Sequence, residues 1–180
     1  YVVLATHRYG SHVLQAILAS IQVAVAGGDS GVAAASEDGV LRTLPELVIA
    51  LYEELELSML ELITDAFASH VVRTMIALLA GVPIASVDDL RSKRSAKYRS
   101  KERQRAMVDD SMHAAGNGHV HVPEDFLQLL LRMYHHISTR LSTDQVHALM
   151  PSATAAPTLS LLLRLEASLP YGKHLSLIHI

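Results

Sequence analysis

Two stretches of the sequence carry the same set of polar side chains at the same spacing. Each has a serine, a histidine directly after it, and a long hydrogen-bonding residue four positions after the serine. The members are Ser11, His12 and Gln15 in the first stretch and Ser69, His70 and Arg73 in the second. A planar imidazole can stack on a nucleobase, and two polar side chains one helical turn apart can reach the edge of that base. The spacing therefore predicts that each of these two groups of side chains contacts a base of single-stranded RNA.

The two stretches align without a gap, as residues 7–18 (HRYGSHVLQAIL) and 65–76 (DAFASHVVRTMI). A helix over either stretch places its polar trio on one side and aliphatic residues on the other. The residues expected to pack inward are Val13, Leu14, Ile17, Leu18, Ile21, Val71, Val72, Met75, Ile76 and Leu79. We expect both trios to face solvent. The competing interpretation is a chance similarity of two packing helices whose histidines are partly buried.

A third, degenerate copy covers residues 155–163 (AAPTLSLLL). Ala156, Pro157 and Ser160 occupy the trio positions there, and this set is poorly suited to stacking on a base or reading it. The first two copies are separated by an insertion over residues 27–39. Internal copies of this kind are typical of helical-repeat proteins, in which each repeat packs on its neighbours.

Positive charge is concentrated in one segment, although the formal net charge of the chain is −3. Eight of the fifteen lysine and arginine residues lie between Arg91 and Arg105, where only Glu102 opposes them. Four of the basic residues are expected to contact RNA phosphates, and these are Lys93, Arg94, Lys97 and Arg99. Two alternatives stay open, because such a run can also be a nuclear or nucleolar address or a solvated connector.

Apolar periodicity and capping signals predict helices almost throughout. The expected helices cover residues 6–25, 43–55, 56–63, 65–79, 88–107, 123–141, 142–150 and 157–169. Their start signals are Thr6, Asp65, Pro123 and two capping boxes, Thr43 with Glu46 and Ser142 with Gln145. No alternating apolar and polar run is long enough for a strand, so we expect no sheet.

Several function classes are disfavoured. Residues 9–28 carry no charged side chain, but their polar stripe favours a soluble amphipathic helix over a membrane span. The chain has no cysteine, and it lacks the serine-hydrolase elbow, the phosphate-binding glycine loop and the zinc-protease motif. His113, His119 and His121 lie in a glycine-containing loop and are a weak metal signal. We therefore expect no catalytic activity, no metal, no cofactor and no small-molecule substrate.

The order of these motifs resembles the nucleolar protein 9 family of Pumilio-like proteins. The resemblance rests on residues 7–15, 65–73, 91–95 (RSKRS) and 156–159 (APTL). It implies an all-α, right-handed α-solenoid of three-helix repeats that reads one base per repeat. By this resemblance, Ser11 and Gln15 contact a base edge while His12 stacks, as in the adenine-reading type. Ser69, Arg73 and His70 do the same in the second repeat, although a serine–arginine pair departs from the common pairs.

The resemblance also implies how the chain is divided and what it does. The expected units are the end of one repeat (1–26), a loop insertion (27–40), a repeat (41–87), a basic segment and loop (88–122), a degenerate repeat (123–170) and a tail (171–180). The last six residues, LSLIHI, resemble translated sequencing adaptor and are expected to be an artefact.

The function implied is that of a factor in the nucleus and nucleolus that binds ribosomal precursor RNA during small-subunit maturation, with pre-ribosomal proteins as further partners. The alternatives are a cytoplasmic Pumilio-type regulator of messenger RNA and a helical-repeat scaffold that binds only protein.

Overall fold

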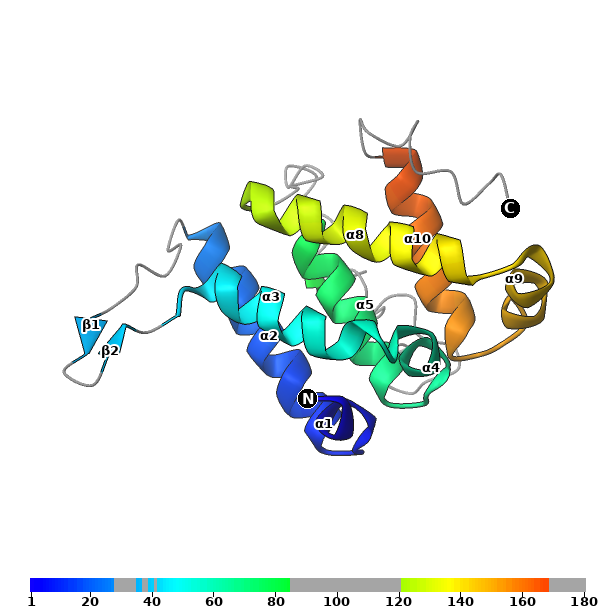
Figure 1. Cartoon of the computed structure of the whole chain (residues 1–180), viewed down its shortest axis with the longest axis horizontal. Helices are drawn as coiled ribbons and strands as arrows, with labels where there is room; N and C mark the ends of the chain where they lie inside the picture. The colour runs from blue at the N-terminus through cyan, green and yellow to red at the C-terminus, as the bar shows by residue number, and fades with distance from the viewer. Residues whose placement is uncertain (28–34, 37–38, 41, 85–120, 169–180) are drawn as a thin grey trace, which may run out of the picture.

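The computed structural model describes residues 1–27, 35–36, 39–40, 42–84 and 121–168 (Figure 1). Its helices follow one another in a pattern of short and long elements. They are α1 (Val2–Thr6), α2 (Gly10–Ala26), α3 (Leu44–Glu56), α4 (Met59–Thr64), α5 (Ala68–Leu79), α8 (Glu124–Arg140), α9 (Thr143–Leu149) and α10 (Ala155–Ser168). The expected all-α repeat fold is confirmed.

Helix α5 is the centre of the described structure. Helix α2 packs along it, and α8, α10 and α4 also contact it, so that every residue from Val71 to Ala80 is buried. Figure 1 shows α3 and α8 crossing the molecule in front of α2 and α5. The core is aliphatic, with three large aromatic side chains, Tyr52, Phe126 and Tyr134, fully buried within it. A helix covered on all sides has no solvent face, and this decides the position of the second polar trio.

Side-chain caps start three of the described helices, α3, α5 and α9, where the sequence predicted. Thr43 with Glu46 and Ser142 with Gln145 form complete capping boxes at α3 and α9. Asp65 Oδ1 accepts hydrogen bonds from the backbone N–H groups of Phe67 (2.8 Å) and Ala68 (2.7 Å), which holds the start of α5. The expected role of Thr6 is wrong, because Thr6 ends α1 and its hydroxyl donates back to the carbonyls of Val2 and Val3.

A two-residue antiparallel ladder pairs Ala35 with Val40 and Ser36 with Gly39, so the expected absence of any sheet is wrong at this one hairpin. A ladder of two residues has no room for the alternation that identifies a strand in sequence. The expected helix over residues 88–107 lies outside the described residues.

The loop after α5 is hydrogen-bonded to α2. Gly81 has a φ of 65°, a left-handed conformation that suits glycine, and its N–H donates to the carbonyl of Leu78 while Val82 N–H donates to that of Ala77. Gln22 then holds this loop from α2, because its Nε2 donates to Val82 O (2.8 Å) and its Oε1 accepts from Ile84 N (3.0 Å). These bonds join α2 to the loop after α5, which lies 60 and 62 residues further along the sequence.

Gly10 allows α1 to lie close against the start of α2. A Cβ atom at this position would sit 2.5 Å from the backbone oxygen of Leu4 and 2.6 Å from its Cδ1. We expect Gly10→Ala to lower the free energy of unfolding by about 1–3 kcal/mol, as overpacking against backbone does. Urea denaturation followed by circular dichroism measures this loss.

Gly27→Ala is the matched control. A Cβ atom there would lie 3.4 Å from Ala24 O, and Gly27 already has a right-handed φ of −76°. We expect this variant to be unchanged or slightly more stable, because alanine restricts the unfolded chain. Equal losses in the two variants would contradict a close contact at Gly10.

Candidate nucleic-acid interface

The first polar trio lies at the start of α2, and only part of it reaches solvent. His12 is exposed and Gln15 is half-buried, with its Nε2 donating to Ser11 O (3.0 Å). Ser11 is buried, and its hydroxyl donates to Arg8 O (3.2 Å) in the turn before the helix. The expected exposure of Ser11 is therefore wrong, since the first turn of α2 packs under α1. The ring of His12 and the amide of Gln15 are the parts of this trio that an RNA base can meet.

The second polar trio lies on α5 and is mostly enclosed. Ser69 is 1% exposed and Arg73 is 7% exposed, while His70 is half-buried. The Ser69 hydroxyl has no hydrogen-bond partner among the described residues. The expected solvent exposure of Ser69 and Arg73 is thus wrong. The periodicity of one helix identifies its polar side, but it cannot show which other elements of the fold cover that side.

Arg73 connects α5 to α10. Its Nη1 donates to Thr154 O (3.3 Å) and to Thr158 Oγ1 (3.4 Å), and its Nη2 lies 2.8 Å from His70 Nδ1. A guanidinium can only donate, so Nδ1 of His70 is the acceptor and the proton of the neutral ring is on Nε2. Thr154 extends the connection, because its hydroxyl donates to Thr64 O (2.9 Å). Arg73 therefore has a structural role, because it links α5, in the set α3–α5, to α10, in the set α8–α10.

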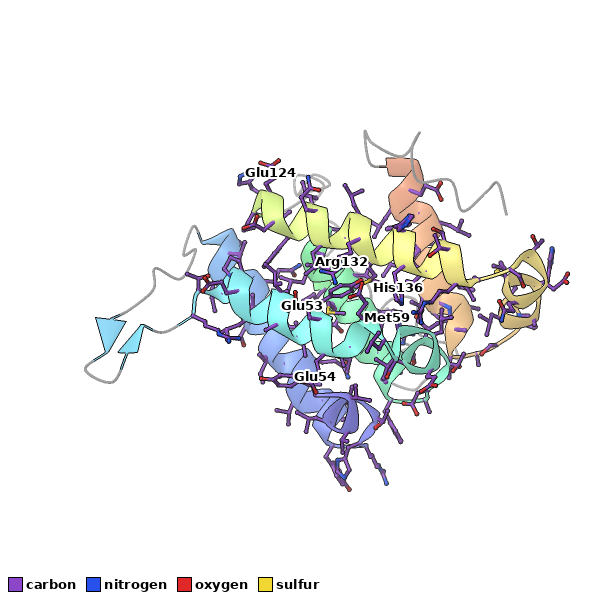
Figure 2. The ribbon with its side chains drawn as sticks, viewed as in Figure 1. Glu53, Glu54, Met59, Glu124, Arg132 and His136 are labelled. Atoms are coloured by element: carbon purple, nitrogen blue, oxygen red, sulfur yellow. The ribbon has the colours of Figure 1, made fainter. Side chains whose placement is uncertain are left out.

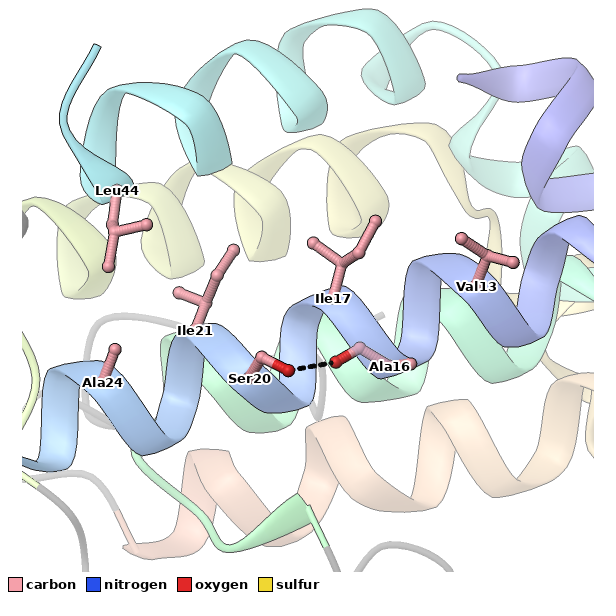
Figure 3. Close-up of a pocket in the computed structure, with 7 residues that line it drawn as sticks. All are labelled: Val13, Ala16, Ile17, Ser20, Ile21, Ala24 and Leu44. Atoms are coloured by element: carbon pink, nitrogen blue, oxygen red, sulfur yellow. Dashed lines mark hydrogen bonds between the residues drawn. The ribbon is translucent and has the colours of Figure 1, made fainter. Parts of the chain in front are cut away.

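The aliphatic side of α2 is only partly covered. Leu14, Leu18 and Ile21 are buried as expected, but Val13 is 53% exposed and Ile17 is 48% exposed, so the expected inward packing of these two is wrong. A shallow apolar hollow of about 630 Å³ follows this side of α2 (Figure 3). It is lined by Val13, Ala16, Ile17, Ser20, Ile21, Ala24 and Leu44. The lining has no ionisable group, which makes the hollow a packing surface and not a site for acid–base chemistry.

The remaining predicted residues are placed as follows. Ala156, Pro157 and Ser160 are half-buried in the first turns of α10, where they follow the Arg73 contact with Thr154. Lys93, Arg94, Lys97 and Arg99 lie outside the described residues, and their phosphate contacts stay predictions.

A polar cluster between α3 and α8 was not found from the sequence (Figure 2). Arg132 Nε donates to Glu56 Oε1 (3.1 Å) and its Nη2 to Oε2 (2.5 Å), while the guanidinium carbon lies 5.5 Å from the centroid of the Tyr52 ring. Tyr52 Oη donates to Glu56 Oε1 (3.1 Å), and His136 Nδ1 lies 3.6 Å from the same oxygen. The spacing of Tyr52 and Glu56, at i and i+4, was the one local sign of this cluster. Their partner Arg132 is 76 residues from Glu56 in the sequence.

The α3–α8 cluster makes stability depend on pH. Burial acts to raise the pKa of Glu56, but the hydrogen bonds from Arg132 and Tyr52 and the Arg132 charge outweigh it and hold the pKa below its ordinary value. A carboxyl with a lowered folded-state pKa stabilises the fold above its unfolded pKa and loses that contribution as pH falls through the folded value. The contribution of Glu56 is therefore complete at neutral pH.

We expect Glu56→Gln to lower the free energy of unfolding by about 1–3 kcal/mol at pH 7, the usual range for hydrogen bonds to a charged group. The difference from the wild type should shrink steadily below about pH 4, where glutamate is protonated in the unfolded chain. Glu53→Gln is the control, since Glu53 lies 3.9 Å from Arg132 at a more exposed position and should contribute little. Urea titrations at pH 7, 5 and 3 test this, and a pH-independent Glu56 effect would contradict it.

Among the residues that the structure describes, no group of three or more histidine, aspartate and glutamate side chains gathers where a metal ion can be held. None of the helices in the described ranges has both the length and the apolar content needed to cross a membrane.

Repeated short and long helices around a shared aliphatic core define the chain as a helical-repeat protein. Residues 1–177 match the NOP9-like PUF repeat domain, and the chain belongs to this family. Its relatives include proteins called Nucleolar protein 9. The one from Fusarium vanettenii is 27% identical over 94% of this chain and 24% of its own length, and the one from Arthroderma gypseum is 31% identical over 69% and 18%. The one from Meyerozyma guilliermondii is 26% identical over 92% and 23%.

The chain thus spans about a quarter of the length of these curated relatives that match most of it. No solved structure matches it.

Proposed function

We propose that this chain forms part of a single-stranded RNA-binding surface in a repeat protein of the nucleolus. The observation that carries the proposal is the exposed His12 ring beside the half-buried Gln15 in a chain of the PUF repeat family, at positions that resemble the base-reading positions of a Pumilio repeat. In this proposal His12 stacks on a base and Gln15 contacts its edge. His70 stacks on a second base, with Arg73 holding the ring, and Ser11 and Ser69 support the helices from inside.

The proposed repeat units follow the helix order. Helices α3, α4 and α5 form one repeat and α8, α9 and α10 form the degenerate one. Helices α1 and α2, a short helix followed by a long one, form the end of another repeat. Two successive units are then joined by Arg73 on one side and by the Glu56–Arg132 pair on the other. Joined repeats hold base-contacting side chains at fixed spacing, which is what reading consecutive bases requires.

The proposed target is ribosomal precursor RNA during small-subunit maturation, with pre-ribosomal proteins as neighbours. The name Nucleolar protein 9 of the relatives supports a nuclear and nucleolar location. The basic run at Lys93, Arg94, Lys97 and Arg99 supports contact with phosphates, whatever the base sequence. No catalytic role is proposed.

Ultraviolet crosslinking of the full-length protein in cells, followed by sequencing of the attached RNA, tests this function. We expect reads from ribosomal precursor RNA, reduced in a His12→Ala variant that is expressed at the same level. Reads from messenger 3′ ends would favour a Pumilio-type regulator of messenger RNA. Recovery of protein partners without RNA would favour the scaffold.

A further inference from the structure

The turn between α1 and α2 holds three exposed side chains in contact. The guanidinium carbon of Arg8 lies 5.5 Å from the centroid of the Tyr9 ring, and the His7 and Tyr9 rings are 6.0 Å apart at 51°. Tyr9 is 68% exposed, so most of its surface reaches solvent. The turn itself is fixed, because His7 Nδ1 accepts hydrogen bonds from Tyr9 N (3.3 Å) and Gly10 N (3.2 Å).

The equivalent turn in the second copy shows which side chains of the first turn are needed for folding. Asp65 there caps the next helix through the same two backbone positions as His7, so the cap accounts for His7. Ala66 stands at the position of Arg8, which shows that the turn forms without a cation. Phe67 stands at the position of Tyr9 but is only 37% exposed. Folding therefore explains neither the charge of Arg8 nor the large exposed surface of Tyr9.

The surroundings of this turn suit an anionic partner with flat rings. Residues 1–28 contain no aspartate or glutamate, and no carboxylate of the described residues forms an ion pair with Arg8. His12, the exposed ring of the first trio, follows on the first turn of α2. An unpaired base can stack on an aromatic ring regardless of its sequence, and an arginine can meet its phosphate.

We propose that the His7–Tyr9 turn is an additional contact for single-stranded RNA, in which Tyr9 stacks on an unpaired base and Arg8 meets a neighbouring phosphate. The contact extends the surface formed by His12 and Gln15, and it rests on the RNA binding proposed above. Its base contact is sequence-tolerant, because a stacked ring reads no hydrogen-bonding edge. The turn adds affinity and helps to place the strand, while Gln15 provides selectivity.

The test is fluorescence anisotropy of the full-length protein with fluorescein-labelled 14-nucleotide RNA of randomised sequence. We expect Tyr9→Ala to weaken binding about 5- to 10-fold, near the low end for loss of one stacked base, and Tyr9→Phe to bind like the wild type. Arg8→Gln should lower the slope of log affinity against log salt by about 0.7, the value for one phosphate contact on a single strand. Ultraviolet crosslinking with peptide mass spectrometry should identify an RNA adduct on Tyr9.

Arg140→Gln is the matched control, because Arg140 is an exposed arginine at the end of α8 and should leave the salt slope unchanged. Melting curves of all variants check the fold, which these exposed positions should preserve. If the wild type binds RNA while Tyr9→Ala binds within twofold of it and Tyr9 carries no adduct, the turn is not a contact and the function stands. If the wild type binds no RNA, both proposals are overturned.

Discussion

Replacing Lys93, Arg94, Lys97 and Arg99 with glutamine is expected to flatten the salt dependence of RNA binding. Each phosphate contact on a single strand contributes about 0.7 to the slope of log affinity against log salt, so four contacts contribute about 3. Between 50 and 200 mM salt, the wild type should then lose about 50-fold more affinity than the variant. Anisotropy titrations on one single-stranded RNA at four salt concentrations measure both slopes.

A matched control separates these contacts from a general effect of charge. Arg42, Arg140 and Arg164 are exposed and lie on separate parts of the described structure. Their combined change to glutamine removes almost the same charge and should alter the slope far less. If the quadruple variant and the triple control variant have equal slopes of log affinity against log salt, the basic run is an address signal or a connector. Its four residues then do not contact RNA.

Local signals in the sequence were sufficient to predict most of the helices. The boxes at Thr43 and Ser142 depend on residues three positions apart, and the structure confirms both. Asp65 likewise acts on backbone groups two and three residues away. Interactions of this range are decided within one turn of helix, and so a single sequence is enough to find them.

Burial depends on helices far away in the sequence, and there the predictions were less accurate. The sequence correctly predicted that the apolar side of α5 packs inward. It wrongly predicted that the polar side of α5 faces solvent. In the structure Ser69 and Arg73 are both buried, and Arg73 contacts Thr154 and Thr158, which are more than 80 residues away. Val13 and Ile17 show the opposite error, since they have the pattern of core residues but no described element covers them fully. Periodicity identifies the sides of a helix, and only the arrangement of repeats decides which sides are covered.

The long-range polar contacts could not be predicted from the sequence for the same reason. Gln22 holds the loop after α5, and Arg132 reaches Glu56 on α3, yet neither pair has a spacing that links its members in sequence. Arg73 was interpreted as a base reader because it stands where Gln15 stands in the first copy. Its environment suggests another role, which mutation can distinguish from base reading.

Arg73→Ala is expected to lower the free energy of unfolding by about 2–4 kcal/mol. The substitution removes a charged donor from a nearly buried position and leaves Thr154 O and Thr158 Oγ1 without it, and buried polar atoms left unpaired are costly. It also removes the hydrogen bond from the guanidinium to His70 Nδ1, one of the contacts that orient the ring. Arg73→Met keeps most of the packing volume, and its loss relative to alanine separates hydrogen bonding from the cavity. Urea denaturation gives the three stabilities.

Gln15→Ala is the comparison that decides the role of Arg73, because the two residues occupy the same position in the two copies. Gln15 makes a local hydrogen bond to Ser11 O and is half-buried, so its loss should cost less than about 1 kcal/mol. It should instead change which base is preferred at one position of an RNA panel that differs there. For Arg73→Ala we expect reduced stability with unchanged base preference in the folded protein. A stable Arg73→Ala variant with altered base preference would show that Arg73 turns outward to read RNA, and α5 and α10 would then be held together mainly by their aliphatic residues.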